Sequence, residues 1–130
     1  MLAAAAVVMC ALNLLGRSHT IAPIELLATP PPTQSANAEA FVTRDPPTIY
    51  LITSTEAFRD AASDDSRSRL DGCRKIASII VHEEWHVRHG PDEEGAYSAQ
   101  VIALMAMGAQ PVQINQVRRS MTAVLKTATR

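Results

Sequence analysis

Apolar residues dominate residues 76–81, a segment that is interrupted only by Ser78. In a helix this segment would be apolar on nearly every side, and a helix that is hydrophobic all round is buried. Gly90 and Pro91 end this helix, because Gly suits the residue after a helix end and Pro suits the first turn of the next helix. We therefore expect a buried central helix followed by a sharp corner.

Two further helices are predicted after the corner. Residues 92–107 form the first of them, and Gly108 ends it. Residues 112–128 form the second, in which apolar side chains recur at helical spacing and make a stripe for packing: Ile114, Val117, Met121 and Val124. The first of these helices is expected to return along the central helix as a tight αα-hairpin.

Strand patterns lie before the central helix. Residues 48–53 are β-branched and aromatic and follow two prolines, and residues 40–43 are expected to pair with them as a weaker strand. The stronger strand is a candidate for pairing with an extended peptide, although a purely structural strand is the simpler interpretation. The predicted fold class is α+β and mostly α, with a short N-terminal strand or hairpin packed on three to four helices.

The segment between the strands and the central helix contains a pattern that predicts the start of another helix. Residues 53–56 have the form of a capping box, which predicts a helix through about Ala62. Residues 63–69 consist of Asp, Ser and Arg, and we expect them to form an exposed loop. Ser68 and Asp71 are both candidate caps for the central helix.

The N-terminus carries an apolar run, residues 2–15, that is typical of an export signal or a short membrane anchor. No Lys or Arg precedes it, and the best cleavage candidate, residues 36–38, lies well downstream. An ordinary buried Ala-rich helix is the alternative. We predict an apolar leader over residues 1–28, a Pro-rich linker over residues 29–38 and one small domain over residues 39–130. The leader predicts a protein that is exported (periplasmic or secreted) or anchored to a membrane.

Charge narrows the range of partners. A net charge of -1 and a pI near 6.4 give no electrostatic reason to expect a nucleic-acid partner. The charges are uneven, since no acidic residue follows Glu94. Four basic residues do follow it: Arg118, Arg119, Lys126 and Arg130. A solvated helix face is the simplest interpretation, and an acidic or lipid-headgroup partner is the alternative.

The two cysteines predict little. Cys10 lies in the apolar leader, so removal of the leader would leave Cys73 as one thiol with no internal disulfide. Cys73 is expected to be a small buried side chain rather than a metal ligand. It lies about 13 Å from His82 along a helix that rises roughly 1.5 Å per residue.

The chemistry of the chain is concentrated just after the apolar segment, where His82, Glu83 and His86 form the pattern H-E-x-x-H. At about 100° per residue, positions four apart lie on one helix face, so both imidazoles can reach a single ion. Glu83 lies one step round the same helix, where its carboxylate can hold a water molecule instead of the metal. This pattern predicts a hydrolytic zinc site.

A hydrolytic zinc site needs a third protein ligand and an open position for water. The corner at Gly90 would bring Glu93, in the first turn of the returning helix, opposite His86. Glu94 points about 100° away from Glu93, so one of the two is expected to bind. His89 is a rival on the same helix face, but it lies about 10.5 Å from His82 at roughly 1.5 Å per residue.

Residues 82–86 (HEEWH) and residues 93–97 (EEGAY) resemble the gluzincin group of zinc metallopeptidases, in which an H-E-x-x-H helix is followed by a helix with Glu-x-x-Ala plus an aromatic residue or Asp. The resemblance covers under a quarter of the chain and favours Glu93 over Glu94. It implies three ligands for one zinc ion, namely His82, His86 and Glu93.

The resemblance implies hydrolysis of a peptide or protein substrate, with Glu83 as general base. Tyr97 is expected to donate to the developing oxyanion or to support one of the histidines, and half-buried packing is its alternative. Two other functions stay open. One is a zinc-binding module without turnover, and the other is a protein-interaction domain that docks a partner through Arg118 and Arg119.

Overall fold

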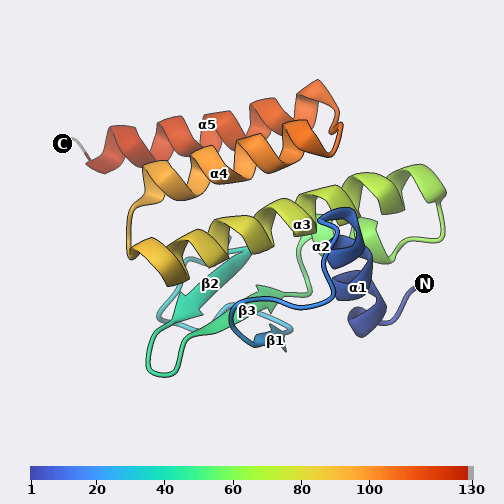
Figure 1. Ribbon diagram of the computed structural model, residues 1–130, viewed down its shortest axis with the longest axis horizontal. Coiled ribbons are helices and arrows are strands. Elements are labelled where there is room, and N and C mark those ends of the chain that lie inside the picture. The colour runs from blue at the N-terminus through green and yellow to red at the C-terminus, as the bar shows by residue number, and fades with distance from the viewer. Residues whose placement is uncertain (129–130) are drawn as a thin grey trace.

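The computed structural model describes residues 1–128, so Arg130 of the predicted basic tail lies outside the described residues. The long helix α3 crosses the centre of the molecule, with a small sheet on one side and α4 and α5 on the other (Figure 1). Helices α1 and α2 pack against its N-terminal part. The elements in chain order are α1 (Ala4–Leu14), β1 (Ile24–Leu27), β2 (Ala40–Thr43), β3 (Thr48–Ile52), α2 (Glu56–Ala62), α3 (Ser66–His89), α4 (Glu93–Ala106) and α5 (Pro111–Ala128). The α+β, mostly helical fold class is confirmed.

The sheet has three strands in the order β1-β3-β2. Strand β2 pairs antiparallel with β3, as predicted, and Phe41 stacks on Tyr50 across the pair with ring centroids 4.8 Å apart. Strand β1, which lies in the segment assigned to the leader, pairs parallel with the other edge of β3. Because both edges of β3 are occupied, the suggestion that this strand pairs with a peptide is wrong. The edge strand beside α3 is β2.

The N-terminal apolar run is a helix of the core. Val7 and Ala11 are fully buried and belong to the same hydrophobic cluster as the apolar residues of α3. Cys10 forms a disulfide with Cys73 of α3, whereas removal of a leader was expected to leave Cys73 as one thiol with no internal disulfide. The alternative of an ordinary buried Ala-rich helix describes this segment. Within the described chain, no helix is both long and apolar enough to cross a membrane. Export and a membrane tether stay predictions.

Residues 29–38 do not separate the packed N-terminal segment from the rest of the fold. They connect β1 to β2 within one sheet and fold into turns, in which Gln34 N donates to Pro31 O and Ala38 N donates to Ser35 O. The boundary predicted near Glu39 therefore does not coincide with a boundary of packing. The prolines and small polar residues that resemble a linker form a compact surface connection instead.

Helices α2 and α3 each begin a few residues away from the start that the sequence predicted. Thr55, and not Thr53, caps α2 by accepting a hydrogen bond from Phe58 N. Asp65 caps α3 by accepting from Ser68 N at 2.9 Å, so the predicted loop over residues 63–69 is shorter and Ser68 lies inside the helix. The first turn of α3 is polar and lies outside the hydrophobic core. It can form without apolar residues because the cap satisfies one of its free N–H groups.

The corner between α3 and α4 forms as predicted. Gly90 has a φ of 80°, which favours glycine, and Asp92 caps α4 by accepting from Gly95 N at 3.1 Å. Gly95 also allows α4 to approach α3, since a Cβ at this position would lie 2.4 Å from the Trp85 ring. Helix α5 then packs on α4 through Val117, which is buried with Val101 and Leu104.

Candidate metal centre

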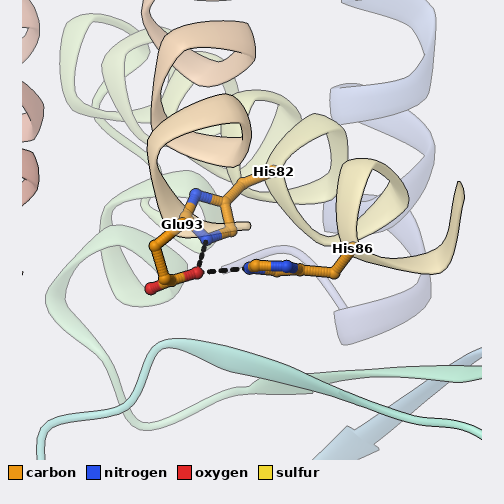
Figure 2. Close-up of side chains that lie close together, drawn as sticks. All are labelled: His82, His86 and Glu93. Carbon is orange, nitrogen blue, oxygen red and sulfur yellow. Dashed lines mark ion pairs between the residues drawn. The ribbon is translucent and has the colours of Figure 1, made fainter. Parts of the chain in front are cut away.

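Three side chains meet at the corner between α3 and α4. His82 and His86 project from α3, and Glu93 reaches them from the first turn of α4 (Figure 2). Glu93 Oε1 lies 3.4 Å from His82 Nε2 and forms a closer ion pair with His86 Nε2. One ligand atom from each residue lies within 4.8 Å of the others, which is a spacing that one metal ion can bridge. The structure thus brings together the three ligands expected from the sequence.

Hydrogen bonds to the other ring nitrogens orient both imidazoles. His86 Nδ1 lies 2.8 Å from the carbonyl oxygen of Gly90, which can only accept, so Nδ1 carries the hydrogen. His82 Nδ1 lies 2.9 Å from Gln100 Oε1. In each ring Nε2 is therefore the nitrogen available to a metal. This arrangement matches a zinc site in which each histidine donates its second N–H to the protein.

The orientation of Gln100 follows from a buried chain of hydrogen bonds. Ser78 Oγ donates to Lys75 O at 2.7 Å, and Gln100 Nε2 donates to Ser78 Oγ at 3.1 Å. The amide oxygen of Gln100 must then face His82. Gln100 was not predicted from the sequence, although two signals were available: a polar amide on the apolar side of α4, and a serine that interrupts the apolar segment of α3.

The electrostatics of the cluster hold the carboxylate in its charged form. Hydrogen bonds from His82 and then His86 lower the pKa of Glu93 to about 2. The same contact with Glu93 raises the pKa of His86 above its usual value. Glu93 is therefore ionised and ready to bind a cation at any pH near neutrality. Protonated His86 cannot bind a metal ion, and its raised pKa extends protonation to higher pH, so affinity for the metal should fall as the pH drops.

Glu83 lies beside the three ligands but is not one of them. Its side chain is buried, with 6% of the residue surface exposed, and Oε1 lies 3.9 Å from His82 Nε2. Burial raises the pKa of Glu83, against the opposing effect of the two histidines. A carboxylate with a raised pKa can accept a proton near neutral pH, so the role of Glu83 as general base stays a prediction.

Tyr97, one turn beyond Glu93, contacts His82 with its ring. The two rings pack edge to face with centroids 4.5 Å apart. Burial raises the pKa of the Tyr97 hydroxyl, so this group keeps its proton near neutral pH. The contact supports the orientation of His82, and donation by the hydroxyl to a substrate stays a prediction.

The rival ligands lie elsewhere. Glu94 is exposed, and the His89 ring lies against Trp85 with centroids 3.9 Å apart. Glu84, the charged residue inside the motif, turns away from the cluster. It accepts two hydrogen bonds from Arg17, at 2.6 and 2.9 Å, and one from Ile21 N at 3.1 Å. It thereby connects α3 to the segment between α1 and β1.

The cluster opens into a cavity of about 610 Å³. Its lining residues come from the helices α3, α4 and α5 and also from β2 and the turns of residues 34–39. His82, Glu83, His86 and Glu93 all line this cavity. All four side chains can therefore be reached from one cavity.

Comparison of the chain with family models, with curated proteins and with solved structures finds no match. Function is therefore inferred from the chemistry of the site.

Replacing Gln100 by Leu is expected to weaken zinc binding about 10- to 100-fold, because His82 loses the acceptor that orients its ring. Competition with a chromophoric chelator measures the affinity. Gln116→Leu, on the exposed face of α5, makes the same chemical change away from the cluster and should leave the affinity unchanged. Equal affinities for wild type and Gln100→Leu would contradict this role.

Proposed function

We propose that this protein is a zinc-dependent peptide hydrolase that uses His82, His86 and Glu93 as metal ligands and Glu83 as general base. The observation that supports this most strongly is the hydrogen bonding of the two histidines. Both Nδ1 atoms face protein acceptors, and both Nε2 atoms converge on the Glu93 carboxylate. A pair of histidines buried for packing alone has no need of this convergence.

The donor set suits zinc. Two imidazole nitrogens and one carboxylate oxygen are a known catalytic combination, and it leaves a position open. When bound, zinc would supply a Lewis acid that polarises a carbonyl group and lowers the pKa of water. The residues that would hold it come from two elements joined by a short corner. Their geometry is therefore supported by the packing of α4 on α3.

Glu83 carries the proton transfers in this proposal. Its carboxylate faces the cavity beside His82 and, with its pKa raised by burial, can take a proton from the attacking water. The same carboxyl group can then give this proton to the leaving amine nitrogen. Tyr97 supports His82 from the other side through its ring.

The cavity also suits an extended chain as substrate. Strand β2 lies at the edge of the sheet and lines the cavity through Ala40, Phe41 and Val42. An edge strand has backbone N–H and C=O groups without strand partners, and an extended peptide can bind to them as an added strand. This favours a peptide over a compact small molecule.

The proposal is tested with the full chain. The purified protein is expected to hold one zinc ion and to cleave members of a mixed peptide library, detected by mass spectrometry. A chelator should stop cleavage, and added zinc should restore it. Zinc binding without cleavage of any peptide would instead favour the module without turnover. A protein that neither holds zinc nor gains thermal stability from it would overturn the proposal.

A further inference from the structure

Within residues 1–128, one cation that lines the cavity forms no ion pair with an acidic group. Arg44 directly follows β2 and lines the cavity together with the ligands. Its Nη2 lies 3.4 Å from the carbonyl oxygen of His86, which places the guanidinium at the end of α3 next to the cluster. Among residues 1–128, no carboxylate forms an ion pair with Arg44.

Capping of α3 does not account for this position. The carbonyl oxygen of His86 already accepts a hydrogen bond from Gly90 N at 2.9 Å. The contact from Arg44 is long by comparison and uses one of the five N–H donors of a guanidinium. Most of the donors of Arg44 are therefore available to another group.

The other charged groups of the cavity have partners. Lys75 lies 3.8 Å from Glu39, and Glu93 lies between the two histidines. Glu83 is buried beside His82. Among the described charged residues that line the cavity, Arg44 is thus the one without an ion pair, and it follows β2, along which an extended substrate would bind.

We infer that Arg44 binds a carboxylate of the substrate close to the bond that is cleaved. A guanidinium is planar and matches a carboxylate with two parallel hydrogen bonds, which a lysine cannot do. The carboxylate is either the free C-terminus of a peptide or the side chain of Asp or Glu. This inference rests on the proposed function, because it names the substrate class of the same site.

Binding to an inactive protein tests it without turnover. The full-length Glu83→Gln variant, loaded with zinc, is titrated with fluorescent peptides of one sequence in three forms. The first has a free C-terminus, the second is amidated, and the third is amidated with Asp in place of one neutral residue. We expect a peptide that carries the recognised carboxylate to bind about tenfold more tightly than the neutral amidated form.

Changing Arg44 should remove this difference. In the Glu83→Gln background, Arg44→Gln is expected to bind all three peptides with the same weak affinity, and Arg44→Lys should restore only part of the preference. Arg88→Gln is the matched control, since Arg88 is exposed near the same end of α3 and does not line the cavity. It should bind the peptides as the parent does.

The binding preferences show which carboxylate is recognised and whether Arg44 recognises it. Preference for the free C-terminus identifies a terminal carboxylate, and preference for the Asp peptide identifies an acidic side chain. Equal binding of all three peptides, or a preference that survives Arg44→Gln, overturns the inference. Failure of the proposed function would appear differently, as wild-type protein that binds these peptides with the Arg44-dependent preference but cleaves none of them.

Discussion

Replacing Glu83 by Gln is expected to lower the rate of peptide hydrolysis about 10²- to 10⁴-fold while the protein keeps its zinc. The amide cannot accept the proton of the attacking water, whereas the three ligand residues are unchanged. Glu83 lines the cavity and is not a member of the three-residue ligand group. The substitution therefore separates proton transfer from metal binding.

The melting temperature of Glu83→Gln shows whether its fold is intact. Burial raises the pKa of Glu83, which means that its negative charge is costly in the folded protein. A neutral amide of the same size should leave the melting temperature unchanged or slightly higher. Loss of activity together with a lower melting temperature would indicate a damaged fold instead of a missing base.

The measurements are the turnover rate, the zinc content and the melting temperature of wild type, Glu83→Gln and Glu94→Gln. Glu94 is exposed on α4, so its replacement makes the same chemical change outside the cavity and should retain full activity. Hydrolysis by Glu83→Gln at the wild-type rate would exclude Glu83 as the base. Loss of zinc from this variant would show that Glu83 contributes to metal binding.

Replacing Glu93 by Ala is expected to reduce zinc affinity by at least about 100-fold. Loss of a residue that only hydrogen-bonds to a metal ligand reduces affinity by up to about 100-fold, and loss of a ligand itself should cost more. Glu93 Oε1 is within reach of both Nε2 atoms, and its pKa of about 2 keeps it charged wherever the histidines are neutral. Without this carboxylate, two neutral imidazoles remain. The protein should then lose both hydrolysis and its stabilisation by zinc.

Two rival ligands serve as matched controls for Glu93→Ala. Glu94→Ala removes the neighbouring carboxylate, and His89→Ala removes the imidazole that lies against Trp85. Both variants should keep zinc affinity within about threefold of wild type, as expected of surface substitutions away from a site. Titration calorimetry measures the affinity, and the shift in melting temperature on adding zinc checks it. A larger loss in Glu94→Ala than in Glu93→Ala would reassign the third ligand.

Much of the helical part of the fold was predictable because its signals are local. The apolar segment before His82 predicted burial, and Gly90 and Pro91 predicted the corner that the structure contains. Strands β2 and β3 were also recognised, because β-branched and aromatic residues are concentrated there. Errors of a few residues arose at the starts of α2 and α3. Several Ser, Thr and Asp residues lie close together there, and each is able to cap a helix.

The N-terminal half was less predictable for a different reason. A short apolar helix has the same composition whether it is a leader or part of a core, so composition did not distinguish the two cases. The structure shows contacts that connect the N-terminal segment to α3: a disulfide joins Cys10 of α1 to Cys73, and an ion pair joins Arg17, which follows α1, to Glu84. These residues are 63 or more positions apart. A pattern within one segment carries no information about such pairs.

The sequence by itself determined the pairing of His82 with His86 and the position of Glu83 beside them. Spacing along one helix sets these relations, whatever the helix packs against. The sequence favoured Glu93 over Glu94, and the tertiary structure places Glu93 against the histidines. Only the tertiary structure decided that Gln100 orients His82 and that Arg44 lies at the end of α3. Those relations depend on how α4, β2 and the turn after β2 pack around α3, and packing between distant segments is settled by the whole fold.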